Sequence, residues 1–129
     1  MVVLVMREVA IVGVACLSLA VCAPVLAANH QITKSPNHKI IKVSAERFAF
    51  FPTEITVEKG TVIEFHLTSE DTDHGFHIIG TDVDVQIPKR RRGEMVVTYT
   101  ADTTGRFIIE CSRPCGAGHT AMRATLIVK

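Results

Sequence analysis

The sequence predicts an all-β protein, a Greek-key β-sandwich or barrel preceded by a signal peptide. Three observations lead to this fold class. Apolar and polar residues alternate over short segments, these segments are rich in β-branched residues, and turn residues separate them. The chain of 129 residues is long enough for one domain with its own core, which we place at residues 39–129. No segment of this region has the period of an amphipathic helix.

The first three predicted strands alternate clearly. In KIIKVSAERF (39–48), an isoleucine, a valine and an alanine fall on one face. EITVEKG (54–60) alternates two β-branched apolar residues with polar ones and then turns at a glycine. TVIEFHLTS (61–69) directs Ile, Phe and Leu to one side and Glu and His to the other. Each segment therefore predicts a strand with one buried face, as in an antiparallel sandwich or barrel.

The remaining predicted strands are shorter or more apolar. GFHIIG (75–80) and VDVQI (83–87) are short apolar runs, and EMVVTYTA (94–101) returns to strict alternation. GRFIIEC (105–111) and MRATLIVK (122–129) complete the set. Strands at this spacing favour two packed sheets joined in a Greek key.

The N-terminal region predicts export. Residues 1–27 contain a basic residue, an apolar stretch, a proline and an end made of small residues, which is the order of a signal peptide. The stretch 9–28 is also about long enough to cross a membrane as an uncleaved anchor, so both interpretations stay open. Residues 28–38 are polar and predict a flexible linker. We therefore expect a periplasmic or secreted protein.

Charge excludes one class of function and marks one segment. The formal net charge is +1, which gives no electrostatic footprint for nucleic-acid binding. The segment KRRRGE (89–94) is nevertheless strongly basic and predicts a hairpin loop. Such a loop is either simply solvated or able to steer an acidic partner.

The cysteines that would remain in the mature chain lie near its C-terminus. Loss of the signal peptide would remove Cys16 and Cys22 and leave Cys111 and Cys115. In an oxidising compartment a remaining pair of thiols often forms a disulfide. A disulfide is therefore the simplest interpretation of the two cysteines, and a metal site is the alternative to it.

The segment CSRPCGAGHTAM (111–122) contains Cys111, Cys115, His119 and Met122 between two predicted strands. Thiolate, imidazole and thioether together suit copper, because hard cations prefer oxygen and structural zinc rarely uses methionine. A loop fixed at both ends by strands would hold a metal rigidly. One more ligand is expected from elsewhere in the chain.

The segment SEDTDHGFHIIG (69–80) offers two histidines for that role. In an extended segment, residues three apart face opposite sides, so we expect one ligand from His74 and His77. His74 stands beside a glycine at the start of the strand, where the loops gather, and we favour it. His77 is expected to pack near the site or to hydrogen-bond beside it.

These two segments resemble a known family. CSRPCGAGHTAM is similar to the Cys-x3-Cys-x3-His-x2-Met loop of binuclear CuA domains, found in subunit II of haem-copper oxidases and in nitrous oxide reductase. DHGFHIIG resembles the upstream segment that supplies the other histidine. The similarity runs from about Arg47 to Lys129. It implies the cupredoxin type of Greek-key β-sandwich.

The resemblance also implies a ligand set for two copper ions: His74, Cys111, Arg113 through its backbone carbonyl, Cys115, His119 and Met122. Each thiolate would bridge both coppers, and each imidazole would bind one. Met122 would be a weak axial ligand of the copper that His74 binds, with the carbonyl of Arg113 axial on the other. The implied function is single-electron transfer without enzyme activity, to or from a redox protein such as a cytochrome or a terminal oxidase or reductase. By the same resemblance, Phe48 or Phe50 would line the electron entry.

Three alternatives to a binuclear centre stay open on the sequence alone. The two cysteines could form a disulfide without metal. A mononuclear blue-copper site would need Cys115, His119, Met122 and His74, with Cys111 left as a spare thiol. A copper chaperone or storage protein would use the thiols to carry Cu(I) to an oxidase.

Two features depart from the oxidase pattern. A subunit II normally has two transmembrane helices before its copper domain, whereas a single apolar segment stands here, so we expect a free-standing domain. The loop at 89–94 is basic, whereas the oxidase surface that docks a basic cytochrome c is acidic. Simple docking of cytochrome c is therefore not expected.

Overall fold

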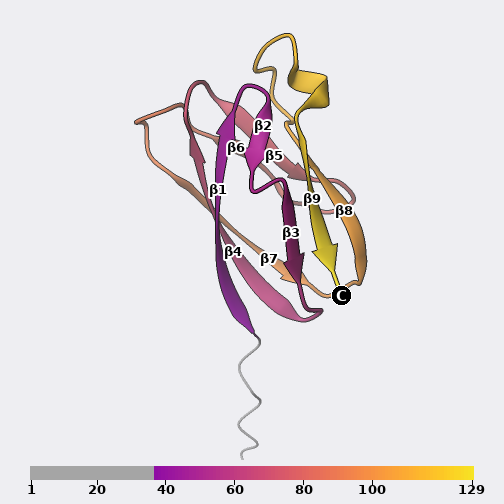
Figure 1. Ribbon diagram of the computed structural model, residues 1–129. Helices are drawn as coiled ribbons and strands as arrows, with labels where there is room; N and C mark the ends of the chain where they lie inside the picture. The colour runs from indigo at the N-terminus through magenta and orange to yellow at the C-terminus, as the bar shows by residue number, and fades with distance from the viewer. Residues whose placement is uncertain (1–36) are drawn as a thin grey trace, which may run out of the picture. The chain divides into compact units, whose positions relative to one another are not determined.

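The computed structural model describes residues 37–129, which form a sandwich of two β-sheets (Figure 1). The expected signal peptide and most of the expected linker lie outside the described residues. The elements are β1 (His38–Glu46), β2 (Ala49–Phe51), β3 (Glu54–Val57), β4 (Thr61–Ser69), β5 (His74–Ile78), β6 (Asp84–Ile87), β7 (Met95–Ala101), β8 (Gly105–Glu110), the 3₁₀ turn η1 (His119–Ala121) and β9 (Arg123–Val128). The all-β prediction is confirmed, and within residues 37–129 no helix is long and apolar enough to cross a membrane.

The two sheets have the strand orders β2-β1-β4-β7 and β3-β9-β8-β5-β6. Most pairs are antiparallel, as expected, but β1 pairs with β4 and β3 pairs with β9 in parallel. The parallel pairs arise because β3 belongs to the second sheet, so the chain returns to the first sheet from the same end at which β1 began. An alternating pattern predicts which face of a strand is buried, but it does not predict which strands pair with it. The sequence prediction of antiparallel pairing was therefore wrong for these two pairs.

The core lies between the sheets and follows the alternation read from the sequence. In β4 the side chains of Ile63, Phe65 and Leu67 are fully buried, and the residues between them are partly exposed. The ring of Phe76 in β5 packs edge-on against that of Phe50, with 6.0 Å between centroids, and at a tilt against that of Phe65, with 5.2 Å between centroids. These contacts hold the start of β5 firmly against β2 and β4.

One end of the sandwich gathers the segments singled out in the sequence. β4 ends at Ser69 and β5 begins at His74, while the connection from β8 to β9 spans 111–122 and includes η1. The β8–β9 connection forms the yellow loop at the top of Figure 1. The fold therefore brings the two segments together although more than thirty residues separate them in the sequence.

Candidate metal centre

The loop from Cys111 to Met122 is closed by its own backbone. The N–H of Cys111 donates to the carbonyl of Met122 at 3.2 Å, so the loop begins and ends at paired positions of β8 and β9. Within it, the N–H of His119 donates to the carbonyl of Gly116 at 3.1 Å and forms the turn η1. A loop with both ends in one sheet and an internal turn positions its side chains with little freedom.

Gly75 lets β5 approach this loop closely. A Cβ atom at this position would collide with Ser112 and would lie 2.6 Å from the backbone nitrogen of Arg113. The N–H of Gly75 instead donates to the sulfur of Cys111 at 3.3 Å. Glycine is therefore required here by contact, because the backbone of β5 lies directly on the loop.

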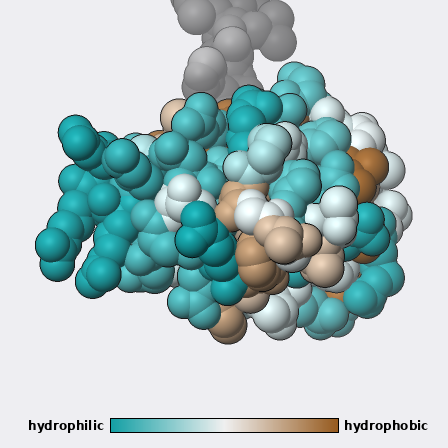
Figure 2. Space-filling view, turned by 90° about the horizontal axis from the view of Figure 1, so that it is seen from above, coloured by the Kyte–Doolittle hydropathy of each residue, from teal (hydrophilic) through white to brown (hydrophobic). Residues whose placement is uncertain are grey.

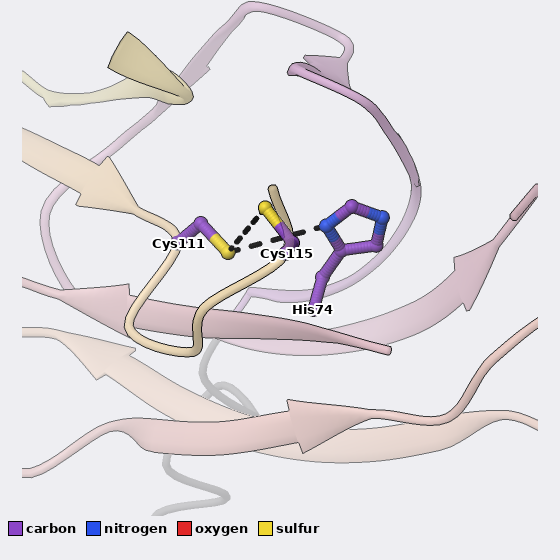
Figure 3. Close-up of side chains that lie close together, drawn as sticks. All are labelled: His74, Cys111 and Cys115. Atoms are coloured by element: carbon purple, nitrogen blue, oxygen red, sulfur yellow. Dashed lines mark hydrogen bonds between the residues drawn. The ribbon is translucent and has the colours of Figure 1, made fainter. Parts of the chain in front are cut away.

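His74 and the two cysteines form a compact buried group (Figure 3). The His74 ring is fully buried, and its Nδ1 lies 4.0 Å from Cys111 Sγ. The two sulfurs lie 3.6 Å apart as free thiols. One donor atom from each of the three residues lies within 4.8 Å of the others.

The other expected donors surround the same sulfurs. His119 Nδ1 lies 4.0 Å and Met122 Sδ 3.9 Å from Cys115 Sγ. The backbone carbonyl oxygen of Arg113 lies 3.1 Å from Cys111 Sγ. The structure thus brings together all six atoms that the sequence nominated as donors.

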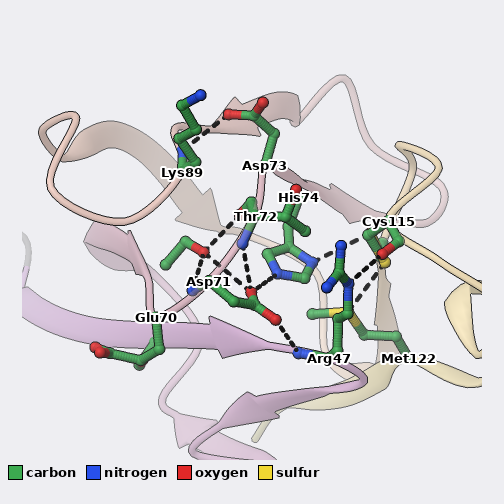
Figure 4. A network of polar contacts seen from close by, with 12 residues as sticks. Arg47, Glu70, Asp71, Thr72, Asp73, His74, Lys89, Cys115 and Met122 are labelled. Carbon is green, nitrogen blue, oxygen red and sulfur yellow. Dashed lines mark hydrogen bonds and ion pairs between the residues drawn. The ribbon is translucent and has the colours of Figure 1, made fainter.

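A carboxylate that sequence reasoning did not identify holds the far side of the His74 ring (Figure 4). Asp71 Oδ1 lies 2.7 Å from His74 Nε2, which leaves Nδ1 facing the sulfurs. Burial raises the pKa of Asp71, but hydrogen bonds from His74 and from the backbone N–H groups of Thr72 and Arg47 outweigh it and bring the pKa to about 2. A carboxylate behind the ring is how proteins commonly orient a metal-binding histidine.

Arg47 ties the two halves of the site together. Its backbone N–H donates to Asp71 Oδ2 at 3.0 Å, and its side-chain Nε donates to the carbonyl of Cys115 at 2.7 Å. One residue after β1 therefore fixes both the carboxylate behind His74 and the loop that carries Cys115. The sequence offered one weak signal, an acidic residue three positions before His74, and none for Arg47.

The remaining candidates lie outside the cluster. His77 is half-buried and pairs through Nδ1 with Glu110 Oε1 at 3.3 Å on the neighbouring strand. Phe50 is fully buried in the core, so it is not at the surface. Phe48 is 37% exposed, and its ring lies against the backbone of Gly118, where a Cβ atom would collide with it.

The donor set fits copper. A metal at a typical metal–thiolate distance of about 2.3 Å from both sulfurs, which lie 3.6 Å apart, would have a sulfur–metal–sulfur angle of about 103°. That angle is close to tetrahedral, so both thiolates can bind one ion without rearrangement. Burial and the neighbouring Cys111 raise the pKa of the Cys115 thiol to about 11, so metal binding has to displace its proton. Two thiolates, two imidazoles and a thioether are soft or borderline ligands, which suit copper.

Comparison with known proteins decides the family. No family model matches the chain. Over 99 residues it is 37% identical to two proteins named cytochrome c oxidase subunit 2, one from Thermus thermophilus and one from a particular strain of the same species. The match covers 76% of this chain, 71% of the first relative and 57% of the second.

The chain belongs to the cytochrome c oxidase subunit 2 family. Solved structures agree on the cupredoxin fold. The periplasmic domain of the oxidase subunit II CoxB of Bradyrhizobium japonicum superposes with a TM-score of 0.62, at 21% identity, over 70% of this chain and 83% of that one. Auracyanin A, a blue copper protein from Chloroflexus aurantiacus, gives a TM-score of 0.59 at 16% identity over 72% of this chain and all of that one.

Proposed function

We propose that this member of the subunit 2 family is a single-electron carrier with a binuclear copper centre of the CuA type. The observation that carries the proposal is the pair of buried sulfurs 3.6 Å apart, with a separate imidazole nitrogen 4.0 Å from each. Met122 and the carbonyl of Arg113 supply a fifth and a sixth donor. Six donors are more than one copper ion of this type uses, and they suit two ions that share the thiolates.

The residues would hold the metal as a closed site. Cys111 and Cys115 would bridge the two ions, and His74 and His119 would each bind one. Met122 would complete the coordination of the copper bound by His74. The backbone carbonyl of Arg113 would complete that of the other copper. When bound, such a centre accepts and releases one electron. The chain's contribution is rigidity, because Asp71, the backbone of β5 and the loop hydrogen bonds keep the donors in place during the redox change.

We expect electrons to reach the centre by way of His119 and Phe48. His119 is half-buried at the surface of η1, and a hollow of about 320 Å³ reaches it and Cys111. The exposed ring of Phe48 covers the adjacent loop. Both groups provide short routes between the buried sulfurs and a protein docked at this end, so the expected electron entry is Phe48 and not Phe50.

Family membership supports a proposal for the redox partner and for the cellular compartment of this chain. The two Thermus relatives are oxidase subunits, and the CoxB domain is periplasmic. We propose that this chain works in the periplasm or as a secreted protein and exchanges electrons with a redox protein, such as a cytochrome or a terminal oxidase or reductase. It would serve such an enzyme without catalysing a reaction itself.

Metal analysis and spectroscopy of the copper-loaded protein test the proposal. We expect two coppers per chain, a purple colour and a paramagnetic mixed-valence state. Cys111→Ser should abolish this spectrum, because the second bridging thiolate is lost. A native spectrum in Cys111→Ser, or a native protein with one copper and a blue colour, would contradict the binuclear assignment. A colourless Cu(I) protein that donates its metal to an apo-oxidase would point to copper delivery instead.

A further inference from the structure

Four consecutive basic residues form an exposed turn between β6 and β7. Lys89, Arg90, Arg91 and Arg92 are all exposed, and the N–H of Arg92 closes the turn by donating to the carbonyl of Lys89 at 3.0 Å. Within the described part of the chain, none of the four side chains takes part in an ion pair. We call these four residues the basic turn.

The backbone of the basic turn is strained in a way that favours glycine. Arg91 has a φ of 62°, in the left-handed region that a side chain with a Cβ rarely adopts. A glycine there would make the turn easier to form. The chain instead places a fourth cation at this position, at a cost in backbone strain.

The basic turn is attached directly to the proposed copper site. The N–H of Lys89 donates to Asp73 Oδ1 at 2.8 Å (Figure 4). The N–H of Arg90 donates to the carbonyl of Asp71 at 3.2 Å. Asp71 in turn holds the buried ring of His74 at 2.7 Å. The four cations are therefore anchored to the segment that carries a copper ligand, at the same end of the sandwich.

Acidic groups near this end are already engaged. The carboxylates of Asp71 and Asp73 accept hydrogen bonds from His74 and from backbone N–H groups. Asp84 lies 4.0 Å from Arg113, and Glu94 lies 2.7 Å from His66. These carboxylates keep their negative charge, and Asp73 lies against the backbone of Lys89, but none of them forms an ion pair with a side chain of the basic turn.

The basic turn is a local concentration of positive charge. Four of the chain's 14 Lys and Arg residues stand next to one another here, whereas the formal net charge of the whole chain is only +1. Figure 2 looks onto the end of the sandwich and shows hydrophilic side chains gathered to one side, beside a smaller area of apolar residues. A charged edge beside an apolar area is a common arrangement at transient protein interfaces, with charge guiding approach and apolar contact closing it.

We propose that the basic turn is the docking edge for an acidic electron-transfer protein, which it orients over the copper end of the domain. The proposal rests on the proposed electron-carrier function. An electron passes only over short distances, so a redox partner has to dock at this end, where the basic turn lies. An anionic membrane would be attracted by the same charges but has no need to approach the metal.

Charge reversal tests the docking edge in the copper-loaded full chain. The probes are a plant-type [2Fe–2S] ferredoxin, which is an acidic one-electron donor, and cytochrome c, which is basic. Stopped-flow rates are measured over a range of ionic strength. We expect Arg90→Glu/Arg92→Glu to slow reduction by ferredoxin about tenfold or more at low salt, with the difference disappearing at high salt. The same variant should speed the reaction with cytochrome c.

The matched control is Lys59→Glu/Lys129→Glu, which changes the net charge equally at the opposite end of the sandwich, where the N–H of Lys59 donates to the carbonyl of Lys129. We expect its rates to stay within about twofold of the native protein. Arg91→Gly should be at least as stable as the native protein and yet react more slowly with ferredoxin. Equal loss in both double variants, or no loss in Arg90→Glu/Arg92→Glu, would overturn the proposal.

Two further measurements separate this proposal from its alternatives. If the basic turn serves a membrane, the native protein should bind phosphatidylserine vesicles and Arg90→Glu/Arg92→Glu should not, while the ferredoxin rates of the two stay equal. Titration of the ¹⁵N-labelled, metal-free chain with ferredoxin should shift the resonances of residues 89–92 whether or not the copper assignment holds. If the metal-free chain shows no such shifts although the copper-loaded protein transfers electrons, the docking edge is refuted and the proposed function stands.

Discussion

Replacing Gly75 with alanine should separate the strand that carries His74 from the loop that carries the cysteines. The new Cβ would lie 2.5 Å from the backbone nitrogen of Ser112 and 2.6 Å from that of Arg113. Ordinary van der Waals contact begins at 3.4 Å, so β5 and the loop have to move apart by about 0.9 Å. Both obstructing atoms are backbone, which no side-chain rotation relieves.

The cost follows from two effects. Overpacking a tight contact costs about 1–3 kcal/mol, and leaving the buried N–H of Gly75 without the sulfur of Cys111 costs about 1 kcal/mol more. We therefore expect Gly75→Ala to lower the free energy of unfolding of the metal-free protein by about 2–4 kcal/mol. The same displacement carries His74 away from the sulfurs, so the affinity for copper should fall as well.

Urea unfolding of the metal-free protein and competitive copper titration measure the two effects separately. Gly80→Ala is the matched control, because Gly80 has a φ of +86° and nothing within 4 Å of its would-be Cβ. It should cost about 1–2 kcal/mol through backbone strain and leave copper affinity unchanged. If Gly75→Ala unfolds within about 0.5 kcal/mol of the native protein and binds copper equally well, the close approach of β5 and the loop is not what positions His74.

Two further changes probe the polar groups around the fold. Asp71→Asn removes the carboxylate behind the His74 ring and should weaken copper binding by about 10- to 100-fold in a competitive titration, with the metal-free fold retained; unchanged affinity would show that the ring is held by packing alone. Hydrogen bonds from His66 to Glu64 and to Glu94 raise the pKa of His66 above 6.5, which an NMR titration measures. Because the folded-state pKa is the higher one, the stability from this contact is fully present below the unfolded pKa of 6.5 and is lost as the pH rises through the raised value. Glu94→Gln should bring the His66 pKa down, and a pKa that does not move would rule out the Glu94 contact as a cause.

Local patterns in the sequence predicted most of the fold. The alternation in β4 placed Phe65 and Leu67 in the core, because the side-chain period of a strand is a local property. Pairing is not local, which is why the parallel neighbours β1 and β4 were missed.

The candidate site shows the same difference between local features, which the sequence predicts, and contacts between distant residues, which it does not. The four candidate side-chain donors within 111–122 were visible because one loop contains them all. His74 was nominated from its place beside a glycine, and the collision that a Cβ at Gly75 would cause gives the physical reason for that glycine. Arg47 could not be found, because its role depends on hydrogen bonds to residues 24 and 68 positions away in the chain.

Copper K-edge X-ray absorption of the loaded protein, combined with electron paramagnetic resonance, shows whether two coppers share the thiolates of Cys111 and Cys115. We expect each copper to have sulfur and nitrogen neighbours and a second copper at short distance, and one unpaired electron to couple equally to two copper nuclei. An unpaired electron coupled to a single nucleus, with no copper neighbour in the scattering, would contradict the binuclear centre.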